Sequence, residues 1–135
     1  MNIVRINAED TWEIRHKVMW PNEDIDFVKM ENDDRGIHYG IIEDKTIVSV
    51  ISLFINEGKA QFRKFATLEK RQGMGYGSKL LSYVLEEAAK LGVRYIWCNA
   101  RKEKAGFYRK FGLAETEKTF KKKGNEYVVM GKYLD

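Results

Sequence analysis

Three alternating glycines stand at the entrance of a helical stretch in RQGMGYGSKLL, residues 71–81. Glycine loses more conformational entropy on folding than any other residue, so such a cluster needs a backbone reason. The first turn of a helix leaves backbone N–H groups unpaired and carries the positive end of the helix dipole. A glycine-rich approach lets an anion reach those groups, which is the chemistry of a diphosphate site. Arg71 and Gln72 can add donors at its rim.

Two common nucleotide-binding patterns do not fit these glycines. The P-loop pattern G-x-x-x-x-G-K-[ST] is absent, and the dinucleotide pattern G-x-G-x-x-G fails because Ser78 stands in place of the third glycine. The alternative to a ligand site is a tight turn that needs positive φ, or close packing of a helix on a sheet. Because the three glycines alternate at a strand-to-helix junction, we favour the ligand site.

The elements that must position this turn follow from the hydrophobic periodicity. Apolar stretches at 3–6, 36–42, 46–56 and 60–67 predict strands. Short polar turns separate the last three, which indicates antiparallel pairing. A further strand at 94–100 follows the glycine turn and its helix, so the two strands that flank the helix should be parallel.

Helices are predicted between these strands. Asn7 can cap a first helix that runs to about Val18. A longer helix begins near Ser78, because apolar residues then recur at helical spacing, and Gly92 ends it. A short helix at 104–112 precedes a terminal hairpin formed by 114–120 and 126–134. The predicted fold class is therefore α/β, with a mixed and mostly antiparallel sheet that carries helices.

Composition excludes several classes of protein. The chain has 135 residues with 44% hydrophobic and 33% charged residues and one proline, which predicts one domain over 1–135. No apolar run approaches the ~20 residues of a membrane span, and Cys98 is the single cysteine, so we expect a cytoplasmic protein with no membrane partner, disulfide or metal. The net charge of +4 mildly favours anionic ligands. A nucleic-acid binder would carry a stronger basic stripe, so no nucleic-acid partner is expected.

Two sequence blocks resemble a known family. QGMGYG, residues 72–77, matches the Q/R-x-x-G-x-G/A signature of the GNAT superfamily, the acetyl-CoA-dependent N-acyltransferases. The wider stretch 62–81 looks like that family's fourth strand, pyrophosphate loop and third helix. The stretch 96–113, IWCNARKEKAGFYRKFGL, is similar to its fifth strand and the following helix. The resemblance covers essentially all 135 residues.

The resemblance implies a cofactor, acetyl-CoA, held between parallel fourth and fifth strands that splay apart. The main chain of Phe65, Ala66 and Thr67 would pair with the pantetheine arm, as an added strand would. Phe65 is expected to pack in the core in addition to this main-chain role. For Phe107 the alternative to cofactor binding is core packing, and for Asn99 it is a turn at the end of the strand. The residues that the resemblance assigns to cofactor binding are Phe65, Ala66, Thr67, Arg71, Gln72, Gly73, Met74, Gly75, Tyr76, Gly77, Ser78, Asn99, Phe107 and Tyr108.

Tyr108 matches the family tyrosine that protonates the departing CoA thiolate. A phenol with a pKa of ~10 stays protonated at neutral pH and can donate to a thiolate whose conjugate acid has a pKa of ~8.5. The chain departs from the family pattern at the base, because some family members carry a strand glutamate near the position of Gln61, and glutamine cannot act as a base. His38 on a predicted strand, Glu31, or a water chain are the candidates.

The acceptor site is predicted from the first helix and the fourth strand. Arg15, Trp20, Gln61 and Arg63 offer cationic groups and an aromatic wall for a small amine that also carries a carboxylate or phosphate. Strand alternation places Gln61, Arg63 and Phe65 on one face. The alternatives are a solvated helix face for Arg15 and a loop anchor for Trp20.

These residues are compatible with two functions. The first is an N-acetyltransferase that moves an acetyl group from acetyl-CoA to a small-molecule primary amine by direct transfer in a ternary complex. The second is a non-catalytic acyl-CoA sensor. A ping-pong scheme through Cys98 is disfavoured, because no histidine lies near it in the sequence and a free buried cysteine behaves as a small hydrophobe. The exposed sheet edges permit a homodimer.

Overall fold

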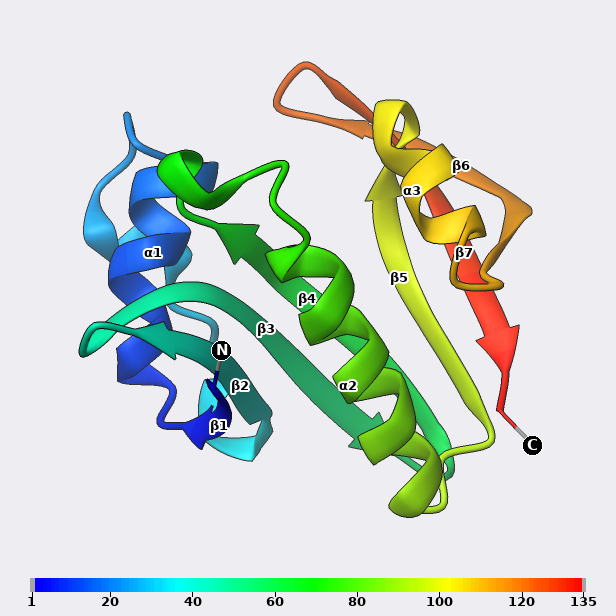
Figure 1. Ribbon diagram of the computed structural model, residues 1–135. Coiled ribbons are helices and arrows are strands. Elements are labelled where there is room, and N and C mark those ends of the chain that lie inside the picture. The colour runs from blue at the N-terminus through cyan, green and yellow to red at the C-terminus, as the bar shows by residue number, and fades with distance from the viewer. Residues whose placement is uncertain (1, 135) are drawn as a thin grey trace.

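A seven-stranded mixed sheet forms the centre of the protein, and a computed structural model describes residues 2–134 of the chain (Figure 1). The strand order is β1-β2-β3-β4-β5-β7-β6. Neighbouring strands are antiparallel except β4 and β5, which pair in parallel as predicted. The strands are β1 (Asn2–Ile6), β2 (Ile37–Glu43), β3 (Thr46–Asn56), β4 (Lys59–Thr67), β5 (Tyr95–Arg101), β6 (Ala114–Lys122) and β7 (Asn125–Tyr133).

Helices cover both faces of this sheet. Helix α1 packs Ile14 against Val50 and Ala66, whereas α2 packs against the neighbouring β3 residue, Ile51. Successive strand residues point to opposite faces, so α1 and α2 lie on opposite sides of the sheet. The helices are α1 (Glu9–Met19), α2 (Tyr76–Lys90) and α3 (Ala105–Arg109), and short 3₁₀ turns are η1 (Ile25–Val28), η2 (Asp33–Arg35), η3 (Glu69–Arg71) and η4 (Lys102–Lys104).

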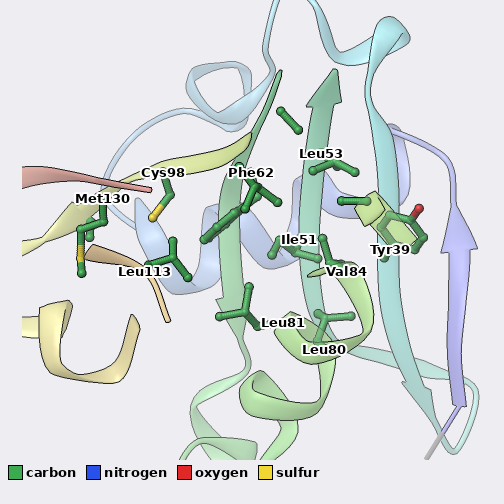
Figure 2. Close-up of a cluster of buried hydrophobic side chains, with 14 of the residues drawn as sticks. Tyr39, Ile51, Leu53, Phe62, Leu80, Leu81, Val84, Cys98, Leu113 and Met130 are labelled. Atoms are coloured by element: carbon green, nitrogen blue, oxygen red, sulfur yellow. The ribbon is translucent and has the colours of Figure 1, made fainter. Parts of the chain in front are cut away.

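The main hydrophobic core lies between the sheet and α2 (Figure 2). Leu80, Leu81 and Val84 come from the predicted apolar face of α2 and are fully buried. Gly92 ends the helix as expected, with φ of 84°. Its N–H and that of Val93 donate to carbonyls of the last helical turn, at 3.1 and 3.0 Å, which is the Schellman arrangement.

Two helix starts differ from the sequence prediction. Helix α1 has Ala8 at its N-cap and no side-chain cap, so Asn7 does not cap it. Instead the Asp10 carboxylate accepts a hydrogen bond from the Asn7 backbone N–H at 2.9 Å. Helix α2 begins at Tyr76 rather than near Ser78, because Gly75, with φ of 87°, is already its N-cap.

A β-bulge in β4 changes which side chains share a face. Arg63 pairs with Ser52 and Ala66 with Val50, so Lys64 and Phe65 together stand opposite one β3 residue. Phe65 therefore packs on the α2 side, 6.2 Å from the Phe107 ring. The predicted common face of Gln61, Arg63 and Phe65 is wrong, because the extra residue inverts the alternation beyond Arg63.

Candidate active site

Strands β4 and β5 separate and leave an opening in the sheet. Their parallel pairing covers only residues 59–61 and 95–97, after which the two strands diverge (Figure 1). A cavity of about 680 Å³ occupies this region, which is within the range of small-molecule sites. Its walls are Val18, Met19, Phe62, Arg63, Lys64, Phe65, Ala66, Thr67, Arg71, Gln72, Gly73, Gly75, Tyr76, Gly77, Ser78, Cys98, Asn99, Arg101, Lys104, Phe107, Tyr108 and Tyr127.

The β4 edge offers main-chain groups to the cavity. The Leu68 N–H donates to a β3 carbonyl at 2.9 Å, and Ala66 is paired with β3 two residues earlier. In an antiparallel ladder, every second residue directs its main-chain N–H and C=O groups to the same neighbouring strand. Those groups of Phe65 and Thr67 therefore point away from β3 and toward the opening. Of the three main-chain positions expected to face a ligand, Ala66 instead faces β3.

The glycine turn forms one end of the cavity. Gly73 and Gly75 have φ of 76° and 87°, and no atom outside the turn lies within 4 Å of where a Cβ would stand on either. The first intrahelical bond of α2 runs from the Lys79 N–H to the Gly75 carbonyl at 3.1 Å. The N–H groups of the preceding three residues, 76–78, therefore have no partner within the helix and are available to an anion.

Glu43 at the end of β2 anchors this turn. It accepts a hydrogen bond from the Arg71 Nε at 2.6 Å and another from the Tyr76 hydroxyl. These two bonds hold the pKa of the Glu43 carboxyl below its usual value. The Gln72 side-chain amide donates to the Thr67 carbonyl at 2.9 Å and closes the turn onto β4. Arg71 and Gln72 thus line the cavity while they also fix the shape of the turn.

Tyr108 lies on the opposite wall, on α3. Its ring packs 5.8 Å from the ring of Phe62 and 5.3 Å from that of Phe107. Burial, with a smaller contribution from Cys98, raises the pKa of the Tyr108 hydroxyl above its ordinary value. Burial also raises the pKa of the Cys98 thiol to about 12, so this thiol stays neutral, as expected of a cysteine that packs as a hydrophobe.

Five residues assigned to the site from the sequence do not line the cavity. They are Met74, which is 62% exposed, and Arg15, Trp20, Gln61 and His38. Trp20 packs edge-on against Phe27 at 5.2 Å. Gln61 lies where β4 and β5 are still paired. The other predicted cofactor residues, and Arg63 of the predicted acceptor group, do line it.

Arg15 and His38 belong to a buried network on the α1 side. Arg15 pairs with Asp33 through two hydrogen bonds, of 2.9 and 3.0 Å, and donates to Ser52 Oγ at 3.0 Å. His38 Nε2 lies 2.7 Å from the Asp33 main-chain oxygen, which can only accept, so Nε2 carries the proton. Nδ1 then accepts from the Ser52 hydroxyl at 2.7 Å. Both ring nitrogens of His38 are occupied, and it has no free lone pair for an acceptor amine.

Several cavity residues were not selected from the sequence. Lys64, Arg101, Lys104 and Tyr127 all line it, and all but Tyr127 are cationic. Simple alternation would place Lys64 on the opposite face of β4 from Arg63, whereas in the structure it lies in the bulge and lines the cavity beside Arg63. Arg101 and Lys104 lie within the 96–113 block, at the end of β5 and just after it, and this position was the signal that could have identified them.

None of the helices in the described part of the chain is long and apolar enough to cross a membrane. Within residues 2–134, no three His, Cys, Asp or Glu side chains gather in a way that could hold a metal ion.

Known proteins resemble this chain in both sequence and structure. Residues 4–113 match the model of the acetyltransferase (GNAT) family. The uncharacterized N-acetyltransferase YitI of Bacillus subtilis (strain 168) is 33% identical, with 99% of this chain and 97% of that protein covered. An acyl-CoA N-acyltransferase from Pseudomonas aeruginosa has a similar structure, with a TM-score of 0.80 and 15% identity over 96% of this chain and 97% of that one. A GNAT family acetyltransferase from Elizabethkingia anophelis with acetyl-CoA bound has a TM-score of 0.77 and 16% identity over 98% and 97% of the two chains. The sequence match over most of its length shows that this chain belongs to the GNAT family of acetyltransferases.

Proposed function

We propose that this protein transfers the acetyl group of acetyl-CoA directly to the primary amine of a small acceptor that also carries a carboxylate or phosphate. The observation that carries the proposal is the opening between β4 and β5. There the stretch of β4 that is not paired with β5, the N-terminal turn of α2 and Tyr108 all border one cavity. In this proposal the pantetheine arm adds to the β4 edge and the diphosphate lies on the glycine turn.

The reaction follows from this arrangement. The acceptor amine attacks the thioester carbonyl, a C–N bond forms, and the oxyanion accepts a hydrogen bond from a β4 main-chain N–H of Phe65 or Thr67. Collapse of the tetrahedral intermediate breaks the C–S bond and expels a thiolate whose conjugate acid has a pKa of ~8.5. Tyr108 donates its phenolic proton to that sulfur. Cys98 forms no acyl intermediate, because its raised pKa keeps the thiol protonated.

Calorimetry with acetyl-CoA and a thiol-release assay on the same sample test this function. We expect micromolar binding, and release of CoA thiol that depends on an added amine. A suitable panel is glycine, L-glutamate, O-phosphoethanolamine and spermidine. Binding without thiol release from any amine would favour the acyl-CoA sensor. Absence of binding would contradict both functions.

The glycine turn provides a sharp test of cofactor binding. We expect Gly75→Asp to weaken acetyl-CoA binding at least tenfold, because it places a carboxylate in the open space beside the α2 amides. Gly75→Asn is the matched control: it is nearly the same size and tolerates positive φ, but it is neutral. Calorimetry on the two variants should give a much smaller loss for Asn. Equal losses would point to backbone strain and contradict the diphosphate assignment.

The anionic group of the acceptor is assigned to the basic wall of the cavity. Arg63 lines the wall, and no Asp or Glu of residues 2–134 lies within salt-bridge distance of it. A hydrogen bond to a charged group contributes about 1.5–3 kcal/mol, so Arg63→Met should raise KM at least tenfold for glutamate or O-phosphoethanolamine. KM for spermidine, which has no anionic group, should not rise. A uniform rise would contradict the assignment.

A further inference from the structure

The walls of the cavity lack the usual proton acceptors. Among the lining residues within 2–134 none is Asp, Glu or His, and the charged ones are all Arg or Lys. Glu31 is exposed and outside the cavity, and the lone pair of His38 is taken by Ser52. An acceptor amine nevertheless has to lose a proton as it becomes an amide. Solvent in the open cavity or a lining group of another kind must therefore accept that proton.

Lys64 lies in the β4 bulge and lines this wall. It has φ of 56°, a left-handed conformation that is costly for a residue with a Cβ. Bulges redirect side chains, and here the chain turns from Arg63, on the α1 side, to Phe65, on the α2 side. Lys64 lies at the changeover and lines the same cavity as Tyr108. In the described part of the chain it has no carboxylate partner within salt-bridge distance.

The surroundings of Lys64 disfavour its charged form. Burial contributes most, followed by the positive charges of Arg63 on β4, Arg15 on α1 and Lys122 on β6, whereas Asp33 in η2 acts in the opposite direction. Together they lower the pKa of the Lys64 amine to about 8. An appreciable fraction of the amine is then neutral near pH 7.5. Cys98, Tyr108 and Tyr76 of the same wall have raised pKa values and so keep their protons, and arginine stays protonated.

We propose that the neutral amine of Lys64 accepts the proton that the acceptor nitrogen loses during acetyl transfer. This role rests on the proposed function. As the C–N bond forms and the C–S bond breaks, Lys64 Nζ takes one N–H proton and becomes an ammonium, while Tyr108 gives its proton to sulfur. Solvent in the open cavity returns the proton from Lys64 to Tyr108, so acetyl-CoA and amine become amide and CoA thiol with no net change in protons.

A purely electrostatic role of Lys64 makes different predictions from a base. If its positive charge only bound an anionic acceptor, arginine would replace it, and loss of the charge would raise KM. A base must instead be able to lose its proton, which arginine cannot do. The kcat of the Lys64→Arg variant therefore distinguishes the two roles.

The first experiment measures kcat by CoA thiol release from pH 6 to 10, with whichever of glycine, L-glutamate, O-phosphoethanolamine and spermidine the wild-type protein acetylates fastest. We expect Lys64→Met and Lys64→Arg each to lower kcat at least tenfold at pH 8, with acetyl-CoA affinity by calorimetry nearly unchanged. Lys121→Met, at an exposed lysine outside the cavity, is the control and should keep wild-type kcat. Wild-type kcat in Lys64→Arg, or in Lys64→Met, would overturn the inference.

A chemical rescue assigns the pH dependence to this residue. Lys64→Cys alkylated with 2-bromoethylamine regains an amine of nearly the same length, and its thioether sulfur makes that amine less basic than lysine. We expect kcat to recover and its rise with pH, centred near 8 in the wild type, to move to lower pH. The same treatment of the wild-type protein controls for Cys98, which is 2% exposed. A rise that stays at the wild-type position belongs to the acceptor amine and overturns the inference.

These outcomes separate the inference from the function beneath it. No thiol release by the wild-type protein with any of the four amines would overturn the proposed function, and the role of Lys64 would fall with it. Turnover by the wild type that Lys64→Met retains would overturn the role of Lys64 alone.

Discussion

Tyr108→Phe is expected to lower kcat by about 10²-fold or more, because it removes only the hydroxyl that protonates the departing thiolate. The ring would keep its packing against Phe62 and Phe107, so the cavity should hold its shape. Affinity for acetyl-CoA should stay within about twofold, since the interactions assigned to the cofactor involve the glycine turn and the β4 edge. Steady-state kinetics and calorimetry on the same sample measure the two quantities.

Tyr83→Phe is the matched control for this substitution. Tyr83 packs edge-on against Tyr39 at 5.7 Å and does not line the cavity, so kcat should be unchanged. The pH profile adds a second check. Burial raises the pKa of Tyr108 above its ordinary value of 10.0, so loss of its proton should cause no fall in kcat below pH 10. A Tyr108→Phe variant with near wild-type kcat would show that the thiolate leaves without this acid.

Asp33→Ala is expected to lower the free energy of unfolding by about 3–5 kcal/mol, because it leaves the Arg15 guanidinium buried without its counterion. Arg15 is fully buried and Asp33 is 5% exposed. Besides Arg15, the carboxylate accepts hydrogen bonds from Trp12 Nε1 at 3.1 Å and the Met30 N–H at 3.0 Å. Chemical denaturation followed by circular dichroism measures the change.

Two comparisons test whether the lost charge pair is the cause. Glu31→Ala removes an exposed carboxylate two residues away and should change stability by less than about 0.5 kcal/mol. Replacing both partners, as Arg15→Met with Asp33→Leu, should recover most of the stability lost by Asp33→Ala, since no buried charge then remains. A double variant no more stable than Asp33→Ala would mean that its other hydrogen bonds, and not the unpaired arginine, dominate.

The same pair predicts how stability responds to acid. Burial works against ionisation of Asp33, but hydrogen bonds from Arg15, Met30 and Trp12 outweigh it and hold the pKa of the carboxyl below its ordinary 3.8. A lowered folded-state pKa means that the unfolded chain binds the proton more tightly. The stabilisation is therefore fully present above pH 3.8 and is lost as pH falls below it. Arg15→Met should weaken this acid dependence in the same denaturation experiment.

The helices and turns were predicted closely from the sequence because the residues that specify each of them lie within or next to it. The apolar face of α2 has helical spacing and Gly92 has no Cβ, so helix and stop are both set by neighbouring residues. The glycine turn and the 96–113 block likewise indicated where a cofactor site and a candidate acid should lie. These patterns needed no knowledge of which strands meet.

Only the tertiary structure decided what surrounds that site. The bulge depends on how β4 registers against β3; it places Phe65 on the α2 face, and Lys64, which lies in it, lines the cavity. Burial of Arg15 depends on a partner 18 positions away, and His38 is occupied by Ser52, 14 positions away. The structure places both residues outside the cavity, and residue type and alternation do not encode such distant partners. The sequence by itself thus determined the family, the glycine turn and the position of Tyr108, whereas long-range pairing decided which charged groups reach the cavity.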